Sequence, residues 1–237
     1  MAIVIAVHTA ASTWERVRTK PQQRSLQVTG SAVQRIESDL IEWSARVETH
    51  ASDRTEAYRA LRQHIQAATD YLTEQGIGEA DLRVSSVTAH ELIDTEYIGT
   101  GAERVQRRVS RGWQTSQDLL VRSHDIPRVE RVSREITQLL EQGVPISSRA
   151  PLYHYTKLGE LKIDMLARAS ENARVRAERI VQAAGGDKPT KLLAADMGVI
   201  NINPANSTAT SWEGNNDKTS FEKDIITIVH LTFELPE

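Results

Sequence analysis

A short sequence motif typical of the C-terminal end of a helix occurs twice in the 237-residue chain. Residues 72–78 read LTEQGIG and residues 139–145 read LLEQGVP. Each copy follows apolar residues spaced three and four apart, and each stops at a glycine, where helices commonly end in the left-handed conformation. The sequence therefore predicts two amphipathic helices, at 53–75 and 126–142, that end in the same way.

Alternating apolar residues flank both predicted helices. Residues 39–50 (DLIEWSARVETH) and 113–124 (WQTSQDLLVRSH) precede them, and an extended stretch follows each glycine. A period of two is typical of a half-buried strand. We therefore predict two related strand–helix–strand units, at about 38–94 and 109–156. They would form an α+β fold in which amphipathic helices cover largely antiparallel sheets.

The rest of the chain predicts one more helix and two more strands. Alanines recur on one face of the segment 159–184, which lets a helix lie close against a sheet. Strands are predicted at 191–203 and 219–235. The polar stretches 94–108 and 204–218 have no clear period, so we expect them to be loops that connect adjacent strands.

Composition limits the classes of function. The formal net charge is −3, so a nucleic-acid partner is not expected. Cysteine is absent, which excludes disulfides and thiolate chemistry. We take residues 25–237 as one folded domain and residues 1–24 as an apolar segment with a polar tether. That segment is too short to span a bilayer; it is either the remnant of an export signal or anchor, which we favour, or a β-strand.

The sequence carries none of the common catalytic motifs. The sequence has no phosphate-binding loop, no dinucleotide-binding glycine pattern and no pair of histidines at zinc-binding spacing. We therefore predict no catalytic residue, no cofactor and no metal ligand. His50 and His124 occupy equivalent positions in the two repeats. They are either a pair that senses pH or binds an anion, or two local turn residues, and we favour the second interpretation.

Two features are candidates for an interface. Trp212 lies in a polar stretch, where an exposed indole would leave a large apolar area in water; the alternative is that it folds back on its own sheet. Arg104, Arg107 and Arg108 belong to the densest basic run. This run either meets an acidic neighbouring subunit or lipid phosphates, or is simply solvated.

Several stretches together resemble the SIMPL domain family, in particular its exported bacterial branch. The most specific is ENARVRAERIVQAAG after the extended YHYTKL, and the opening LQVTG with Asp39, Ile41 and Trp43 is also typical. The resemblance covers roughly residues 25–237. It implies an α+β fold, a periplasmic location or an anchor at the outer face of the inner membrane, and large closed homo-oligomers in some members. It also implies a link to oxidative-stress tolerance, and no established active site.

The leading hypothesis is a non-enzymatic extracytoplasmic protein that assembles into a closed homo-oligomer, a ring or a cage, with possible membrane association through its N-terminus. The first alternative is a monomeric or dimeric module that binds a protein or peptide. The second is an enzyme for a small metabolite whose polar residues converge only in the folded chain.

Overall fold

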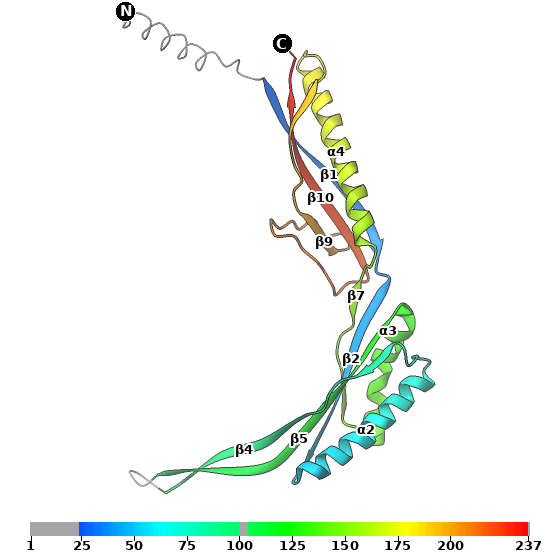
Figure 1. The fold of residues 1–237 in the computed structure, drawn as a ribbon, viewed down its shortest axis with the longest axis vertical. Helices are drawn as coiled ribbons and strands as arrows, with labels where there is room; N and C mark the ends of the chain where they lie inside the picture. Colours follow the sequence, from blue (N-terminus) through cyan, green and yellow to red (C-terminus); the bar gives the residue numbers. More distant parts are fainter. Residues whose placement is uncertain (1–23, 100–103, 237) are drawn as a thin grey trace, which may run out of the picture. The chain divides into compact units, whose positions relative to one another are not determined.

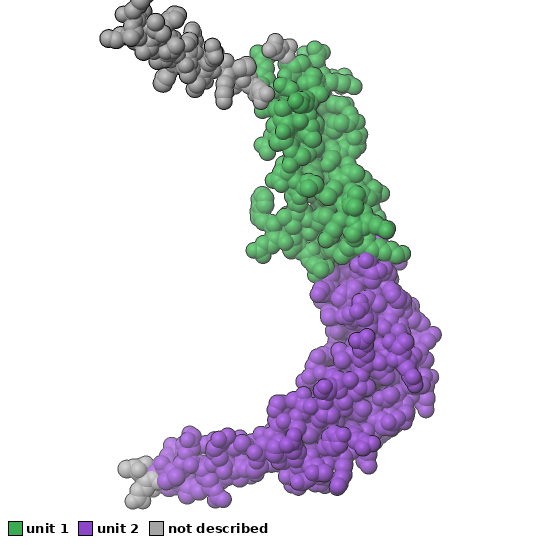
Figure 2. Space-filling view, in the orientation of Figure 1, with its two compact units in different colours: residues 1–35, 157–216, 224–237 green, residues 36–156, 217–223 purple. Residues whose placement is uncertain are grey.

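The computed structural model describes residues 24–99 and 104–236, which form two compact units (Figure 2). Unit 1 comprises the described parts of residues 1–35, 157–216 and 224–237, and unit 2 comprises those of 36–156 and 217–223. The predicted N-terminal segment lies outside the described residues except for Arg24.

Unit 2 contains both predicted repeats. In chain order its main elements are β2 (Leu40–Ala51), α2 (Arg54–Glu74), β3 (Leu82–Val84), β4 (Thr88–Ile98), β5 (Val105–Ser123), α3 (Ile126–Glu135), the 3₁₀ helix η2 (Ile136–Gln142), β6 (Ile146–Ser148) and β7 (Leu152–His154). The described strands form one sheet in which β5 and β2 are central, β3 and β4 pair with β5, and β6 and β7 pair with β2. All of these pairings are antiparallel. This is the order of a split β-α-β arrangement built twice, so the predicted α+β class is confirmed.

The core of unit 2 lies between this sheet and its helices. Ile41, Trp43, Ala45 and Val47 alternate along β2 and are buried, and they pack against buried residues of α2 and α3. This period of two on the strand and three to four on the helices is the pattern that predicted the elements.

The ends of the helices show what the repeated residues do: a side chain caps the start of α2, and a glycine ends each helical segment. The carboxylate of Asp53 accepts hydrogen bonds from the backbone N–H groups of Thr55 and Glu56, which caps α2. Gly76 and Gly143 both have positive φ, at 84° and 78°. The second helix differs from the prediction, because its α-helical part ends at Glu135 and residues 136–142 continue as the tighter η2.

Unit 1 has one sheet and one long helix. Its elements are β1 (Ser25–Glu37), α4 (Leu158–Ala183), β8 (Lys191–Asp196), β9 (Ile200–Pro204) and β10 (Glu222–Glu234). The strand order is β1-β10-β8, and β9 also pairs with β10. The predicted strand 191–203 is therefore two strands. They are separated at Gly198, where a Cβ atom would lie 2.3 Å from the Ile228 carbonyl oxygen.

The alanine face of α4 packs on one side of this sheet. Ala169, Ala173 and Ala177 are fully buried, together with Val229 and other apolar residues of β10. Gly30 of β1 has no side chain at the contact, and the helix backbone approaches it closely. Figure 1 shows α4 on one side of β10 and the segment after β9 on the other.

The predicted loop 94–108 is wrong in most of its length. β4 continues to Ile98 and β5 begins at Val105, so most of the stretch is a two-stranded ribbon. The second predicted loop, 204–218, is irregular after Pro204. The physical reason for the error is that both faces of the ribbon meet solvent, so its sequence carries no alternation of apolar and polar residues.

Candidate functional site

A β-ribbon extends beyond the sheet of unit 2. β2 pairs with β5 up to the partners Ala51 and Trp113, whereas β4 and β5 continue to pair up to Ile98 and Val105. We call the described residues 92–98 and 104–112 the arm. Figure 1 shows β4 and β5 running past the start of α2. Among the described residues of unit 2, therefore, no third strand pairs with the arm and no helix packs on it.

A β-bulge marks the point where the arm leaves the sheet. Leu92 pairs with Gly112, but Ile93 pairs with Ser110, so Arg111 is an extra residue in β5. Gly112 has a φ of 108°, and a Cβ atom there would lie 2.3 Å from the carbonyl oxygen of Ala51. Bulges of this kind bend and twist a ribbon. Glycine is required here because β2 ends directly against the backbone of β5.

Apolar side chains are exposed on both faces of the arm. Ile93 and Tyr97 lie on one face, and the cross-strand partners Ile98 and Val105 lie on the other. All four are exposed, and Val105 most of all, at 65%. A two-stranded ribbon is marginally stable in water without further packing. The arm therefore offers apolar surface and unpaired strand edges to another molecule.

The predicted basic residues lie on the arm. The guanidinium of Arg104 lies 4.2 Å from the centroid of the Tyr97 ring. Arg107 stands opposite Glu96 in the β4–β5 register, and Arg108 is exposed nearby. The same basic run of the sequence, ERVQRRVSR, ends at Arg111.

Arg111 forms two ion pairs across the arm. Its guanidinium contacts the carboxylates of Asp94 and Glu96 at 2.8 Å and 3.0 Å. These contacts hold β4 and β5 together close to the bulge. The sequence did not indicate this role, because the pairing depends on the register between two strands that were expected to be loop.

A second surface is a shallow basin on the sheet face of unit 2 that the helices leave uncovered. It has a volume of about 720 Å³. Ser44 and the exposed Leu120 are cross-strand neighbours on its floor, with Arg83 opposite Leu120 on β3. Exposed Leu152 also lines the basin.

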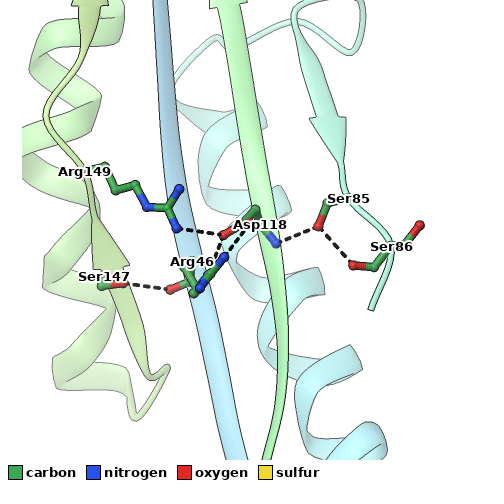
Figure 3. A network of polar contacts seen from close by, with 6 residues as sticks. All are labelled: Arg46, Ser85, Ser86, Asp118, Ser147 and Arg149. Carbon is green, nitrogen blue, oxygen red and sulfur yellow. Dashed lines mark hydrogen bonds and ion pairs between the residues drawn. The ribbon is translucent and has the colours of Figure 1, made fainter. Parts of the chain in front are cut away.

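Ion pairs hold the arginines around this basin. Arg46 binds the carboxylate of Asp118 with two hydrogen bonds of 2.7 Å and 2.8 Å, and Arg149 lies 3.8 Å from the same carboxylate (Figure 3). The hydrogen bond from Arg46 lowers the pKa of Asp118. Arg122 lies 3.3 Å from Glu42. The basin is thus a mixed polar and apolar surface in which most positive charge is already balanced.

The structure separates the two equivalent histidines. Ser123, which precedes His124, pairs with Ile41, while His50 pairs with Gln114 at the other end of the same two strands. The separation is roughly 30 Å at about 3.3 Å per residue. His124 donates a hydrogen bond from Nδ1 to the carbonyl oxygen of Asp39, at 2.5 Å. The two histidines therefore do not form a joint site, and the interpretation of His124 as a local turn residue fits its contact.

Trp212 belongs to unit 1 and does not pack on its own sheet. It is 90% exposed and lines a cavity of about 400 Å³ together with residues of β1, β8 and β10. The arm belongs to unit 2, so the predicted interface residues fall on two separate units. The role of Trp212 as an interface anchor stays a prediction.

The described part of the chain shows neither a metal cluster nor a membrane-spanning helix. Within residues 24–99 and 104–236, no group of three or more acidic or histidine side chains is arranged to hold a metal ion. None of the helices in this described part combines the length and the apolar character that crossing a membrane requires.

These features define an α+β protein with two helix-covered sheets, a projecting β-ribbon and open sheet faces. The family model that matches the sequence is that of SIMPL, described as a protein of unknown function (DUF541), and it covers residues 26–228. The chain therefore belongs to the SIMPL family, as the resemblance indicated. No curated protein matches the sequence.

Proposed function

We propose that this SIMPL protein is a non-enzymatic protein that assembles outside the cytoplasm into a closed homo-oligomer. The observation that carries the proposal is the arm, which exposes apolar side chains on two faces and leaves strand edges without partners. A contact with another copy would cover this surface and supply the missing packing.

The charges of the arm also suit a contact between identical copies. Asp94 and Glu96 lie on the same face as Arg107, and Arg108 lies on the other face with Tyr97. Acidic and basic groups are thus mixed on one ribbon. A surface that carries both signs can be complementary to itself when a two-fold axis relates two copies.

The first experiment measures the mass of the purified protein by mass photometry. The expected result is a single defined stoichiometry well above two for the wild type. Val105→Glu should shift the distribution to smaller species, because it places a charge at the most exposed apolar position of the arm. Leu140→Glu is the matched control, since Leu140 is an exposed apolar residue of η2 in the same unit. A wild-type protein that stays monomeric at working concentration would refute the proposal.

The location outside the cytoplasm is proposed from the resemblance and from the apolar start of the sequence. We further propose that the assembly contributes to envelope integrity under oxidative stress. Fractionation of cells that express the full chain should recover the protein outside the cytoplasm. Recovery only in the cytoplasmic fraction would contradict this part of the proposal and would leave the assembly itself to be judged by mass.

A second function, binding of a peptide or protein partner, is favoured by the basin. Its exposed leucines, Leu120 and Leu152, lie among ion-paired arginines, which is the composition of a contact surface with an apolar centre and a polar rim. If this function is the main one, the wild type has a low mass, and Leu120→Asp abolishes capture of the partner without a change in that mass.

A further inference from the structure

Unit 1 contains a cavity on the side of its sheet that α4 does not cover. Val229, Leu231 and Phe233 of β10 are buried with the alanines of α4, so the alternate residues Ile228 and His230 face the other way. The cavity on that face has a volume of about 400 Å³. This is within the range of small-ligand pockets.

Three polar side chains from neighbouring strands form a row across the cavity. Thr29 of β1 and His230 of β10 are joined by a hydrogen bond of 2.9 Å between Oγ1 and Nδ1. Asp196 of β8 is the cross-strand partner of His230. All three line the cavity. The row presents a carboxylate, an imidazole and a hydroxyl side by side, which are groups that accept and donate hydrogen bonds.

The indole of Trp212 stands beside this row on a loop that buried amides hold in place. The backbone N–H of Ser211, next to Trp212, donates to Oδ1 of Asn201 at 2.9 Å. Nδ2 of Asn203 donates to the carbonyl oxygen of Ala209 at 2.6 Å, and Nδ2 of Asn215 donates to Oδ1 of Asn203 at 3.0 Å. Asn201 and Asn203 are almost fully buried. The loop is therefore anchored to the sheet by satisfied polar groups, although Trp212 itself is 90% exposed.

We propose that this cavity binds a neutral saccharide, with Trp212 as the stacking surface. A pyranose ring has a face of C–H groups, which packs on an indole, and a rim of hydroxyls, which hydrogen-bond to carboxylate, imidazole and hydroxyl groups. Trp212 supplies the first kind of contact, and Asp196, His230 and Thr29 supply the second.

Other classes of ligand fit the cavity less well. The described lining contains no lysine or arginine, and it contains Asp196, so an anion would be repelled. A purely apolar ligand would remove water from the polar row without replacing its hydrogen bonds. A neutral polyol with one apolar face avoids both costs.

The experiment titrates the full-length protein with two probes, cellobiose and N,N′-diacetylchitobiose, and follows the indole N–H signals by NMR. The Trp212 signal, identified by its absence in Trp212→Phe, should shift in a saturable way with at least one probe. Trp212→Ala and Asp196→Asn should each weaken binding by about tenfold or more, in line with the loss of one stacking or charged hydrogen-bond contact.

Met197→Ala is the matched control, because Met197 is an exposed apolar residue next to Asp196 that does not line the cavity. It should leave the affinity unchanged. The proposal is overturned if neither probe shifts the Trp212 signal at its solubility limit. It is also overturned if Trp212→Ala lowers the oligomeric mass without saccharide, since the indole would then be a subunit contact. Both results are independent of the arm variants.

Discussion

Replacing Gly30 by alanine is expected to destabilise unit 1. A Cβ atom at this position would lie 2.1 Å from the carbonyl oxygen of Ala169 and 2.6 Å from the Cβ atom of Ala173, whereas ordinary contact begins at 3.4 Å. The nearest atom belongs to the backbone of α4, so no side-chain rotation can relieve the overlap. The helix must move away from β1, which loosens the contacts of Val28 and the other buried residues of that core.

The size of the effect follows from two opposing contributions. Overpacking of this kind costs about 1–3 kcal/mol. Alanine restricts the unfolded chain more than glycine, which returns about 0.4–1 kcal/mol. The free energy of unfolding should therefore fall by about 1.3 kcal/mol. This corresponds to a decrease of about 3–5 °C in the midpoint of thermal unfolding for a chain of this size.

The assay is urea and thermal unfolding followed by far-ultraviolet circular dichroism. Gly159→Ala is the matched control, because Gly159 lies in the first turn of the same helix and its Cβ would meet nothing within 4 Å. The control should unfold like the wild type or be up to about 1 kcal/mol more stable. If Gly30→Ala is as stable as the control, close packing of α4 on β1 is not what requires glycine here.

Three further predictions concern unit 2. Asp217 has its pKa lowered to about 2 by hydrogen bonds from Thr219, Ser220 and Lys223, which outweigh the opposing effect of burial. The ionised Asp217 carboxylate therefore stabilises the fold above about pH 4, and this stabilisation is lost between about pH 4 and pH 2. In acid unfolding, Asp217→Asn should not show this loss of about 2 kcal/mol, whereas Asp187→Asn, at an exposed position, should show it as the wild type does. Gly112→Ala should lower the free energy of unfolding by about 2 kcal/mol, because of its positive φ and the contact with β2, and a urea midpoint equal to wild type would contradict this. A double-mutant cycle of Arg46→Ala and Asp118→Ala should show a small favourable coupling for this partly exposed pair, and additive effects of the two substitutions would show that the ion pair does not stabilise this face of the sheet.

The helices and most strands of the two repeats could be predicted because their signals are local. The stripe of α2, its cap at Asp53 and the alternation along β2 each depend on residues within one or two turns. The arm could not be predicted in this way. Its apolar residues, such as Ile93 and Val105, lie on both faces of a ribbon without a core of its own, so no period of two appears.

The candidate sites depended on strand register. Trp212 stood out in the sequence as a tryptophan within a polar stretch, but the polar row beside it did not. Thr29 and His230 are 201 positions apart and meet because β1 and β10 are neighbours. Asn201 and Asn203 both fell within the predicted strand 191–203, and only the fold shows that they anchor the loop.

The sequence by itself determined the α+β class, the helices, most strands of the two strand–helix–strand units and the family. The physical reason is that helix periodicity, capping and strand alternation act between residues close in the chain. Only the tertiary structure decided which sheet faces are covered, where β2 stops and the arm begins, and which side chains meet across strands. These outcomes depend on the packing of segments far apart in the chain, such as α4 on Gly30, which no local pattern encodes.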